Sequence, residues 1–226
     1  MTTVAIMQPY FLPYAGYFRL CAAADLFVLL DDVQFQRRGW VHRNRLRNHD
    51  GSLAWLTLPL IKGERDTTRI MDLRFRPAAE EEMQQQLRRF PLADQPNEAT
   101  RPLIASLCPR TDDVTGYLAD QLDQTCRLLG IPARWMRSSA LGIDPAIRQW
   151  QRLVAVARAV GADTYINAPG GRELYDPADF EREGLRLRFL TPYDGPMESI
   201  LQRLHDSDPA TVRAEIDQNL RFDDDD

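Results

Sequence analysis

The stretch that decides the fold is residues 4–32, "VAIMQPYFLPYAGYFRLCAAADLFVLLDD". Its first apolar run, residues 4–7, is too short for a helix and is typical of a buried strand. Pro13 can open a helix because its missing N–H costs nothing in the first turn, so we expect a helix to about residue 24. Residues 26–30 form another apolar run, which predicts a second strand. A strand, a helix and a strand this close together indicate a βαβ unit with parallel strands and a right-handed crossover.

The remaining chain repeats this alternation of strands and helices. We expect further strands at residues 55–60, 133–141, 163–167 and 185–190, and further helices at residues 77–90, 112–129, 144–160, 176–183 and 197–220. Pro59 would interrupt a central strand, so the strand that contains it lies at an edge or ends there. The pattern predicts an α/β fold, with a single domain at residues 1–222 and a mostly parallel, Rossmann-like sheet with flanking helices. Residues 223–226, "DDDD", are expected to form a disordered acidic tail.

Bulk composition limits the classes of function. The chain has 226 residues, of which 44% are hydrophobic and 27% charged, as is ordinary for a globular domain. A formal net charge of -5 argues against a nonspecific nucleic-acid binder. The sequence has no apolar run of about 18 residues. It shows no signal-peptide pattern at its start, and its three cysteines lack paired spacing. We therefore expect a cytoplasmic protein that does not enter the membrane.

Polar residues follow several of the expected strands. Gln8 follows the first strand, Asp31 and Asp32 follow the second, and Asn167 follows a later one. Because ligands bind beyond the carboxyl ends of the strands in an open parallel sheet, we expect these side chains to meet in one cavity. The alternative is that these residues belong to ordinary polar loops. The turn that comes next could add an anion-binding nest, formed by Gly170, Gly171 and Arg172.

The loop after the first strand combines aromatic residues with two prolines, Pro9 and Pro13, which restrict its backbone. Gln8 offers an amide that donates and accepts hydrogen bonds, and Gly16 leaves room for a ligand to approach the first helical turn. The free N–H groups of that turn would suit an anion. Flat surfaces with hydroxyl tips come from Tyr10, Tyr14 and Tyr17. We predict that these residues bind substrate, and the alternative is that the aromatic rings only fill the core.

The adjacent carboxylates of Asp31 and Asp32 have different expected roles. Successive side chains of a strand point to opposite faces, so both cannot reach one reacting atom if the strand continues there. One of them would accept a proton from the ligand or bind Mg²⁺, while the other caps a helix or pairs with an arginine. A metal site needs more carboxylates than the sequence places nearby, so we assign no metal.

A positive patch is expected from residues 36–49, which contain Arg37, Arg38, Arg43, Arg45 and Arg47. Arginine can bind phosphate or carboxylate with two parallel hydrogen bonds. Trp40 and Phe35 interleave with the arginines, so a base or a sugar could stack there. The alternative is a solvated basic loop. The patch is small, and a phosphorylated small molecule or carrier suffices as its ligand.

Several familiar sites are absent from the sequence. The three histidines have no evident Ser or Cys partner. The chain has no P-loop, no G-x-G-x-x-G after the first strand and no zinc-ligand spacing. These absences disfavour a catalytic triad and an NAD-dependent Rossmann enzyme.

Five ordered stretches carry a resemblance to a known family. They are "QPYFLPYAGYF", "DLFVLLDDVQF", "RRGWVHRNRLR", "WLTLPL" and "YINAPGGRELYDPADFEREGLRLRFL". In this order the chain resembles the WbqC-like protein family, with the weakest match at residues 76–112 and after residue 197. Many relatives carry His where this chain has Met7, so we assign no histidine catalyst. The family pattern maps onto Gln8, Pro9, Tyr10, Pro13, Gly16, Tyr17, Asp31, Asp32, Gln34, Trp40, Arg43, Asn44, Arg45, Pro59, Asn167, Gly170, Gly171, Leu174 and Tyr175.

The resemblance implies a bacterial protein associated with O-antigen and other surface-polysaccharide gene clusters, and sometimes with natural-product pathways. It also implies group transfer on sugars or amino-sugars. We therefore expect a transferase in which arginines hold the phosphate of an activated donor and Gln8 and Asn167 orient the acceptor. Asp31 or Asp32 would accept the acceptor's proton. The remaining expected substrate-binding residues are Tyr10, Tyr14, Tyr17, Gln34, Trp40, Arg43, Asn44, Arg45, Gly170, Gly171, Arg172 and Tyr175.

The donor and the type of transfer stay open at this point. The acceptor would be a small molecule, and the phosphate-bearing donor could be a CoA or carrier-protein thioester, an aminoacyl-tRNA or a nucleotide sugar. We favour acyl or aminoacyl transfer because the single domain is small for a glycosyltransferase. One alternative is a non-catalytic binding or accessory protein that hands an intermediate to a partner enzyme. A further alternative is glycosyl or nucleotidyl transfer.

Overall fold

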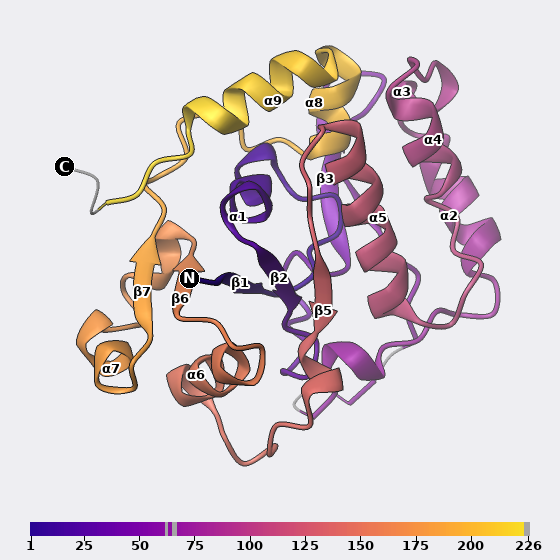
Figure 1. Ribbon diagram of the computed structural model, residues 1–226. Coiled ribbons are helices and arrows are strands. Elements are labelled where there is room, and N and C mark those ends of the chain that lie inside the picture. The colour runs from indigo at the N-terminus through magenta and orange to yellow at the C-terminus, as the bar shows by residue number, and fades with distance from the viewer. Residues whose placement is uncertain (62, 65–66, 224–226) are drawn as a thin grey trace.

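A central parallel sheet organises the computed structural model, which describes residues 1–61, 63–64 and 67–223 (Figure 1). In the described chain this sheet contains five strands, β1 (Thr3–Met7), β2 (Leu26–Leu29), β5 (Trp135–Arg137), β6 (Thr164–Asn167) and β7 (Arg186–Phe189). Their spatial order is β5-β2-β1-β6-β7, and each neighbouring pair is parallel. The expected α/β fold with a Rossmann-like sheet is confirmed. The strand order reverses between β1 and β6, which is where such sheets bind ligands.

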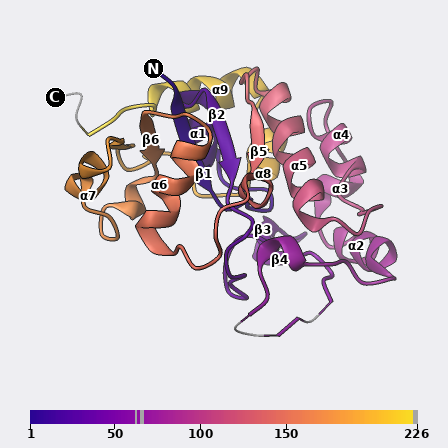
Figure 2. The same cartoon turned by 60° about the horizontal axis from the view of Figure 1, so that its bottom comes forward.

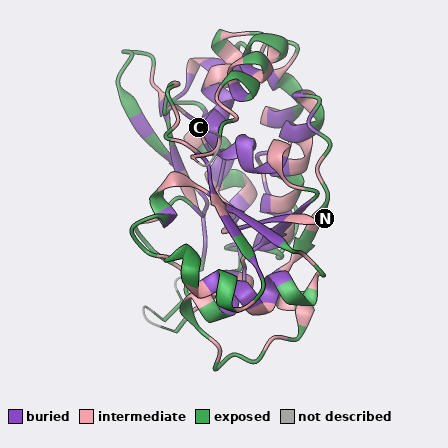
Figure 3. Ribbon diagram, turned by 60° about the vertical axis from the view of Figure 1, so that its left-hand side comes forward, coloured by how far each residue is buried: buried purple, intermediate pink, exposed green. Residues whose placement is uncertain are grey.

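Each face of the sheet is covered by its own hydrophobic core. One core contains Ala5 and Phe27 of the sheet, together with α1 (Phe18–Ala23), α5 (Val114–Leu128), α8 (Ile200–Asp206) and α9 (Pro209–Gln218). The other core contains Val4 and Val28, which lie against α6 (Gln149–Ala159) and α7 (Pro177–Arg182). Figure 1 shows these two helical layers on either side of the sheet, and Figure 3 shows the strands between them as largely buried. Burial on both faces explains why the strands read as apolar runs rather than as alternating patterns.

A separate hairpin is formed by β3 (Arg43–Arg47) and β4 (Leu53–Thr57), which pair in antiparallel fashion apart from the central sheet (Figure 2). Its inner face carries Asn44, Leu46 and Leu56, all buried, whereas the arginines of β3 point outward. The sequence analysis predicted no strand at residues 43–47, so β3 is an element that it missed. The expected strand at residues 55–60 ends at Thr57, before Pro59.

The helices that follow the hairpin in the chain lie beyond α5, away from β1 and β2 (Figure 1). They are α2 (Ala79–Leu87), α3 (Pro91–Asp94) and α4 (Thr100–Ala105). Short 3-10 turns occur at Ala15–Tyr17, Ile70–Asp72, Ser138–Leu141 and Pro169–Gly171. The chain at residues 13–24 is thus a 3-10 turn followed by α1, which begins at Phe18 rather than at Pro13.

Several helices and strands begin or end at other residues than the sequence predicts, because local hydrogen bonds determine their ends. The helix expected from residue 144 begins at Gln149, because the N–H of Ile147 donates to the carbonyl of Asp144 and closes a turn. The strand expected at residues 133–141 ends at Arg137 and continues as a 3-10 turn. The helix expected at residues 197–220 is divided, because Asp208 caps a new helix at Pro209.

The carboxyl end of the described chain packs against the sheet edge. The N–H of Asp223 donates to the carbonyl of Phe189 at 3.1 Å, and Phe222 forms a bridge with Leu190. Asp223, the first residue of the expected tail, thus pairs with the sheet edge, and the rest of that segment, residues 224–226, lies outside the described residues. None of the described helices is long and apolar enough to cross a membrane.

Candidate functional site

A cavity of about 710 Å³ lies at the point where the strand order reverses. Gln8, which follows β1, and Asn167, which ends β6, both line it, as the sequence predicts. We call it the switch-point cavity. The predicted site residues that line it are Gln8, Tyr10, Tyr14, Tyr17, Trp40, Asn167, Gly170, Gly171 and Tyr175.

Asn44 shapes the loop that forms one wall of the switch-point cavity. Its Nδ2 donates hydrogen bonds to the carbonyl oxygens of Leu12, at 2.6 Å, and Phe11, at 3.2 Å. Leu12 has a φ of 47°, a left-handed conformation that is unusual for leucine. The N–H of Phe11 donates to the carbonyl of Trp40 at 2.9 Å. The structure thus places the buried Asn44 beneath the loop rather than in the cavity, where the sequence-based assignment had put it as a substrate-binding residue.

Tyrosine rings form the aromatic walls of the cavity. Tyr17 donates from its hydroxyl to the carbonyl of Gln8 at 2.8 Å, and its ring centroid lies 5.5 Å from that of Tyr10. Tyr14 packs on Tyr193 with a centroid distance of 5.4 Å. A Cβ at Gly16 would overlap the Tyr14 ring and contact Tyr193, so glycine is needed there. Burial raises the pKa of Tyr10, Tyr14 and Tyr17 above the ordinary value, so their hydroxyls stay protonated.

The turn after β6 places Asn167 at the opposite wall. The Oδ1 of Asn167 accepts a hydrogen bond from the N–H of Ala168 at 2.8 Å. A Cβ at Gly171 would overlap Nδ2 of Asn167, whereas a Cβ at Gly170 would meet no atom within 4 Å. Gly171 therefore allows the Asn167 side chain to fold back over the turn. This requirement, rather than an anion nest, explains one of the two glycines.

Arg19 lies in the wall of the cavity, and the sequence analysis did not single it out. Its side chain is fully buried and donates to the carbonyls of Gly16, Thr191 and Asn219 at 3.3, 3.0 and 2.8 Å. Burial lowers the pKa of its guanidinium. Among the described residues Arg19 forms no ion pair with a carboxylate. A signal was available, because Arg19 is the single charged side chain between Met1 and Asp25 in the sequence.

Comparison with known proteins identifies the family. A model of the WbqC-like protein family matches residues 8–197, which is most of the chain. The chain belongs to the WbqC-like protein family. It is 28% identical over 206 residues to the uncharacterized protein Rv1507c of Mycobacterium tuberculosis, and this alignment covers 86% of the chain and 84% of that protein. No solved structure matches. Gln8 and Met197, at the ends of the family match, both line the switch-point cavity.

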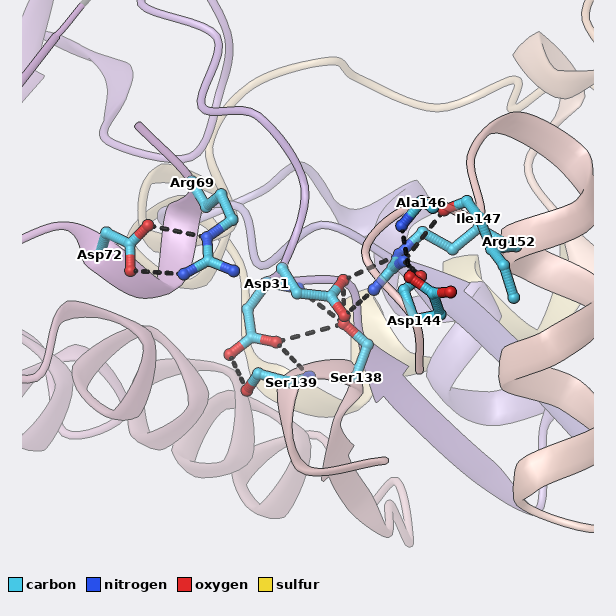
Figure 4. A network of polar contacts seen from close by, with 10 residues as sticks. Asp31, Arg69, Asp72, Ser138, Ser139, Asp144, Ala146, Ile147 and Arg152 are labelled. Atoms are coloured by element: carbon cyan, nitrogen blue, oxygen red, sulfur yellow. Dashed lines mark hydrogen bonds and ion pairs between the residues drawn. The ribbon is translucent and has the colours of Figure 1, made fainter. Parts of the chain in front are cut away.

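Asp31 of this WbqC-like chain lies in a network of polar contacts (Figure 4), and Asp32 joins the same network through Ser138 and Arg152. Neither carboxylate lines the switch-point cavity. Asp31 is fully buried and accepts hydrogen bonds from the N–H and Oγ of Ser139, at 2.9 and 2.8 Å. Asp32 forms an ion pair with Arg152. Ser138 Oγ lies between the two carboxylates, 3.2 Å from Asp31 and 2.7 Å from Asp32. The prediction that both would meet Gln8 in one cavity is therefore wrong in location, and their catalytic role stays a prediction.

A second cavity, of about 550 Å³, lies beside this network. Asp32 and Gln34 line it together with Arg69, Arg148 and Arg152. Arg69 is paired with Asp72 at 2.8 Å, and Gln34 forms a backbone bridge with Arg69. Gln34, expected to bind substrate with Gln8, therefore belongs to a different cavity.

The arginine-rich stretch is only partly at the switch-point cavity. Its segment at Gln36, Gly39 and Trp40 lines the cavity, but Arg43 and Arg45 stack on Trp55 of the hairpin instead. Arg47 pairs with Glu198 and Asp206, and Arg172 pairs with Asp223. The expectation that these arginines enter the cavity with Gln8 is wrong for Arg43, Arg45 and Arg172. Arg43 and Arg45 lie on the outer face of the hairpin, and Arg172 is held by its ion pair with Asp223.

The cavity of this family member offers binding groups rather than acid–base groups. Among the described residues that line it, none is Asp, Glu, His or Cys. The side-chain amide of Gln8 makes no hydrogen bond within the described chain, so it can serve a ligand. The positive charge of Arg19 in the wall favours an anionic ligand. The arrangement can hold a partly aromatic or apolar molecule with polar tips and direct an amide donor at it.

Proposed function

We propose that this WbqC-like protein is a transferase that moves an acyl or aminoacyl group from an activated carrier to an amine in the switch-point cavity. The observation that carries the proposal is a cavity with a free amide at Gln8, protonated tyrosines and Arg19, but no described carboxylate, histidine or thiol in its lining. Such a site can orient two reactants but cannot remove a proton from an alcohol. An activated ester or thioester reacts with a neutral amine without that help.

The proposed reaction needs only positioning and one hydrogen-bond donor. The amine nitrogen attacks the acyl carbonyl carbon, a C–N bond forms and the C–S or C–O bond to the carrier breaks. The proton released by the amine leaves with the carrier thiol or hydroxyl. Holding the two reactants together lowers the barrier. Nε2 of Gln8 would donate to the carbonyl oxygen as negative charge develops on it.

The acceptor class follows from the same chemistry. A hydroxyl acceptor would need a general base, which favours an amine such as that of an amino-sugar or of a natural-product intermediate. The charge of Arg19 further favours a substrate that carries a carboxylate or phosphate. We place the reaction in the biosynthesis of bacterial surface polysaccharides or secondary metabolites, in line with the family resemblance. Asp31 and Asp32 take no part in this proposal because both carboxylates are engaged elsewhere.

The test is a turnover assay with acyl-CoA thioesters and amine acceptors, read by thiol release and by the mass of the acylated product. Gln8→Ala should lower kcat/KM by about a hundredfold, the usual effect of removing one donor to a developing oxyanion. Gln85→Ala, on the exposed face of α2, is the matched control and should leave turnover unchanged. Full activity of Gln8→Ala, with complete loss in a folded Asp32→Asn variant, would contradict the proposal.

A non-catalytic binding protein is the second candidate. The lack of an ionisable base in the described cavity lining also suits a protein that only holds an intermediate for a partner enzyme. In that case a donor or acceptor would stabilise the protein against thermal unfolding, by about 2.7 kcal/mol at a hundred times its Kd. No pair of substrates would then yield product.

A further inference from the structure

The outward face of the β3–β4 hairpin exposes large aromatic surface. Side chains of the two strands alternate, so Trp55 and Arg45 point away from the core, directly opposite each other across the ladder. The ring of Trp55 lies 5.7 Å from that of Trp40, and these side chains are 38% and 40% exposed. Single exposed apolar side chains are common, whereas contiguous exposed apolar surface is typical of binding sites. We call Trp40, Trp55, Arg43 and Arg45 the tryptophan platform.

The tryptophan platform carries positive charge that no described carboxylate cancels. The guanidinium carbons of Arg43 and Arg45 lie 4.1 and 5.5 Å from the ring centroid of Trp55. Arg47, farther along β3, is neutralised by Glu198 and Asp206. Among the described residues neither Arg43 nor Arg45 forms an ion pair, and the side chain of Arg45 donates no hydrogen bond. The platform therefore combines exposed indole surface with two guanidiniums that have no described carboxylate partner, and the guanidinium of Arg45 is the one with donors left for a ligand.

The platform is continuous with the switch-point cavity. Trp40 lines that cavity and also contacts Trp55. Arg43 donates hydrogen bonds to the carbonyls of Arg38, at 2.9 Å, and Gly39, at 3.4 Å, which fixes the segment that ends at Trp40. A ligand that rests on the platform therefore sits at the mouth of the proposed reaction site.

We propose that the tryptophan platform binds the nucleotide of a thioester donor of the coenzyme A type, with the acyl-bearing arm reaching past Trp40 into the cavity. The base would stack on Trp40 and Trp55 while Arg45 binds a phosphate. A neutral sugar would use the indoles but not the guanidiniums. A nucleic acid would need a longer positive track than this chain, with its net charge of -5, provides. This inference rests on the proposed acyl transfer and names its donor.

The test measures the affinity of the full chain for coenzyme A, adenosine 3′,5′-bisphosphate and pantetheine by calorimetry. Coenzyme A and the bisphosphate should bind, and pantetheine, which lacks the nucleotide, should bind at least about tenfold more weakly. Trp55→Ala should weaken coenzyme A binding by about tenfold, and Trp55→Phe should restore most of it because the aromatic face returns. Arg45→Gln should weaken binding and reduce its dependence on salt. Arg148→Gln, an exposed arginine of the second cavity, is the matched control and should change nothing.

The outcomes separate this inference from the proposed transfer. Equal affinity for pantetheine and coenzyme A, or unchanged affinity in Trp55→Ala, would overturn the platform as a nucleotide site even if acyl transfer is observed. Loss of binding in Arg148→Gln alone would place the nucleotide in the second cavity and overturn it too. Single-stranded RNA that binds more tightly as it lengthens would make the platform an RNA surface instead. If no acyl group is transferred but bisphosphate binding depends on Trp55, the platform stands and the transfer reaction fails.

Discussion

Asp32 and Arg152 form an ion pair in which the two side chains expose only 8% and 9% of their surfaces. Arg152 also donates to the carbonyls of Asp144 and Ile147, at 3.3 and 3.1 Å, and so holds the turn before α6. The pair thereby joins the loop after β2 to α6, and both side chains line the second cavity. This position gives Asp32 a structural role, and its predicted catalytic role stays a prediction.

Breaking this ion pair should destabilise the protein strongly. Asp32→Ala leaves the guanidinium of Arg152 buried without its partner, and we expect the free energy of unfolding to fall by about 3–5 kcal/mol. The double variant Asp32→Leu with Arg152→Met removes both charges and should recover much of that loss. Urea denaturation of the single variant, the double variant and the unchanged protein measures the differences in the free energy of unfolding. Asp72→Ala, which removes a surface pair with Arg69, is the control and should cost at most about 1 kcal/mol. Wild-type stability in Asp32→Ala, with loss of turnover, would return Asp32 to the catalytic site.

Removing the Asn44 amide should disturb the first loop and the cavity together. Asn44→Ala leaves the carbonyl of Phe11 without its donor and removes one of the two donors to the carbonyl of Leu12, which keeps Ser199 Oγ at 3.0 Å. The loop above Asn44 holds Leu12 at positive φ. We expect a loss of about 1–3 kcal/mol in the free energy of unfolding and weaker binding of any ligand of the switch-point cavity. Chemical denaturation and ligand titration measure the two effects. Asn48→Ala, near the exposed turn of the same hairpin, should leave ligand binding unchanged. Equal effects of the two substitutions on binding would contradict the role given to Asn44.

Neighbouring glycines in the turn after β6 should respond differently to the same added methyl group. In Gly171→Ala the new Cβ overlaps Asn167 and lies 3.2 Å from the Phe189 ring, so the amide of Asn167 must move. We expect a loss of about 1–3 kcal/mol and reduced ligand binding. Gly170→Ala adds its methyl to open space and should change stability by less than about 0.5 kcal/mol. Thermal unfolding of the pair is the direct comparison, and similar losses in both variants would show that Asn167 is not held by Gly171.

Local pattern predicts the parallel sheet but not the residues that complete the site. The apolar runs of β1 and β2, with a short helix between them, indicate parallel strands because only buried strands read that way. The β3 strand was missed because its sequence "RNRLR" contains one apolar residue. The alternation of buried and exposed side chains becomes evident only when Asn44 is known to be buried. Tyr193 could not be found from sequence, since its partner Tyr14 lies far along the chain. The predicted location of Asp31 and Asp32 was wrong for a related reason. Their partners Ser139 and Arg152 lie far along the chain and come close only when the chain is folded.

His42 should make the protein less stable in mild acid. Burial and the neighbouring charge of Arg43 lower the pKa of His42 from 6.5 to about 4, and its Nδ1 has no hydrogen-bond partner within the described chain. Above pH 6.5 the imidazole is neutral in both the folded and the unfolded protein, so its full contribution to stability is present. Between pH 6.5 and about 4 the unfolded chain takes up a proton that the folded chain does not. Stability is therefore lost as the pH falls through this window, by on the order of 3 kcal/mol in all.

The measurement is the free energy of unfolding across that window in His42→Phe. This variant keeps a ring against Phe35, 5.0 Å away between centroids, but cannot titrate. Its stability should fall less steeply with acid than that of the unchanged protein, by up to about 1.4 kcal/mol per pH unit, because one proton fewer binds on unfolding. Gln85→Ala, an exposed substitution on α2 that removes no titratable group, is the control and should keep the original slope. An unchanged slope in His42→Phe would mean that the imidazole is hydrated and titrates normally, because then folded and unfolded chains bind the same number of protons there.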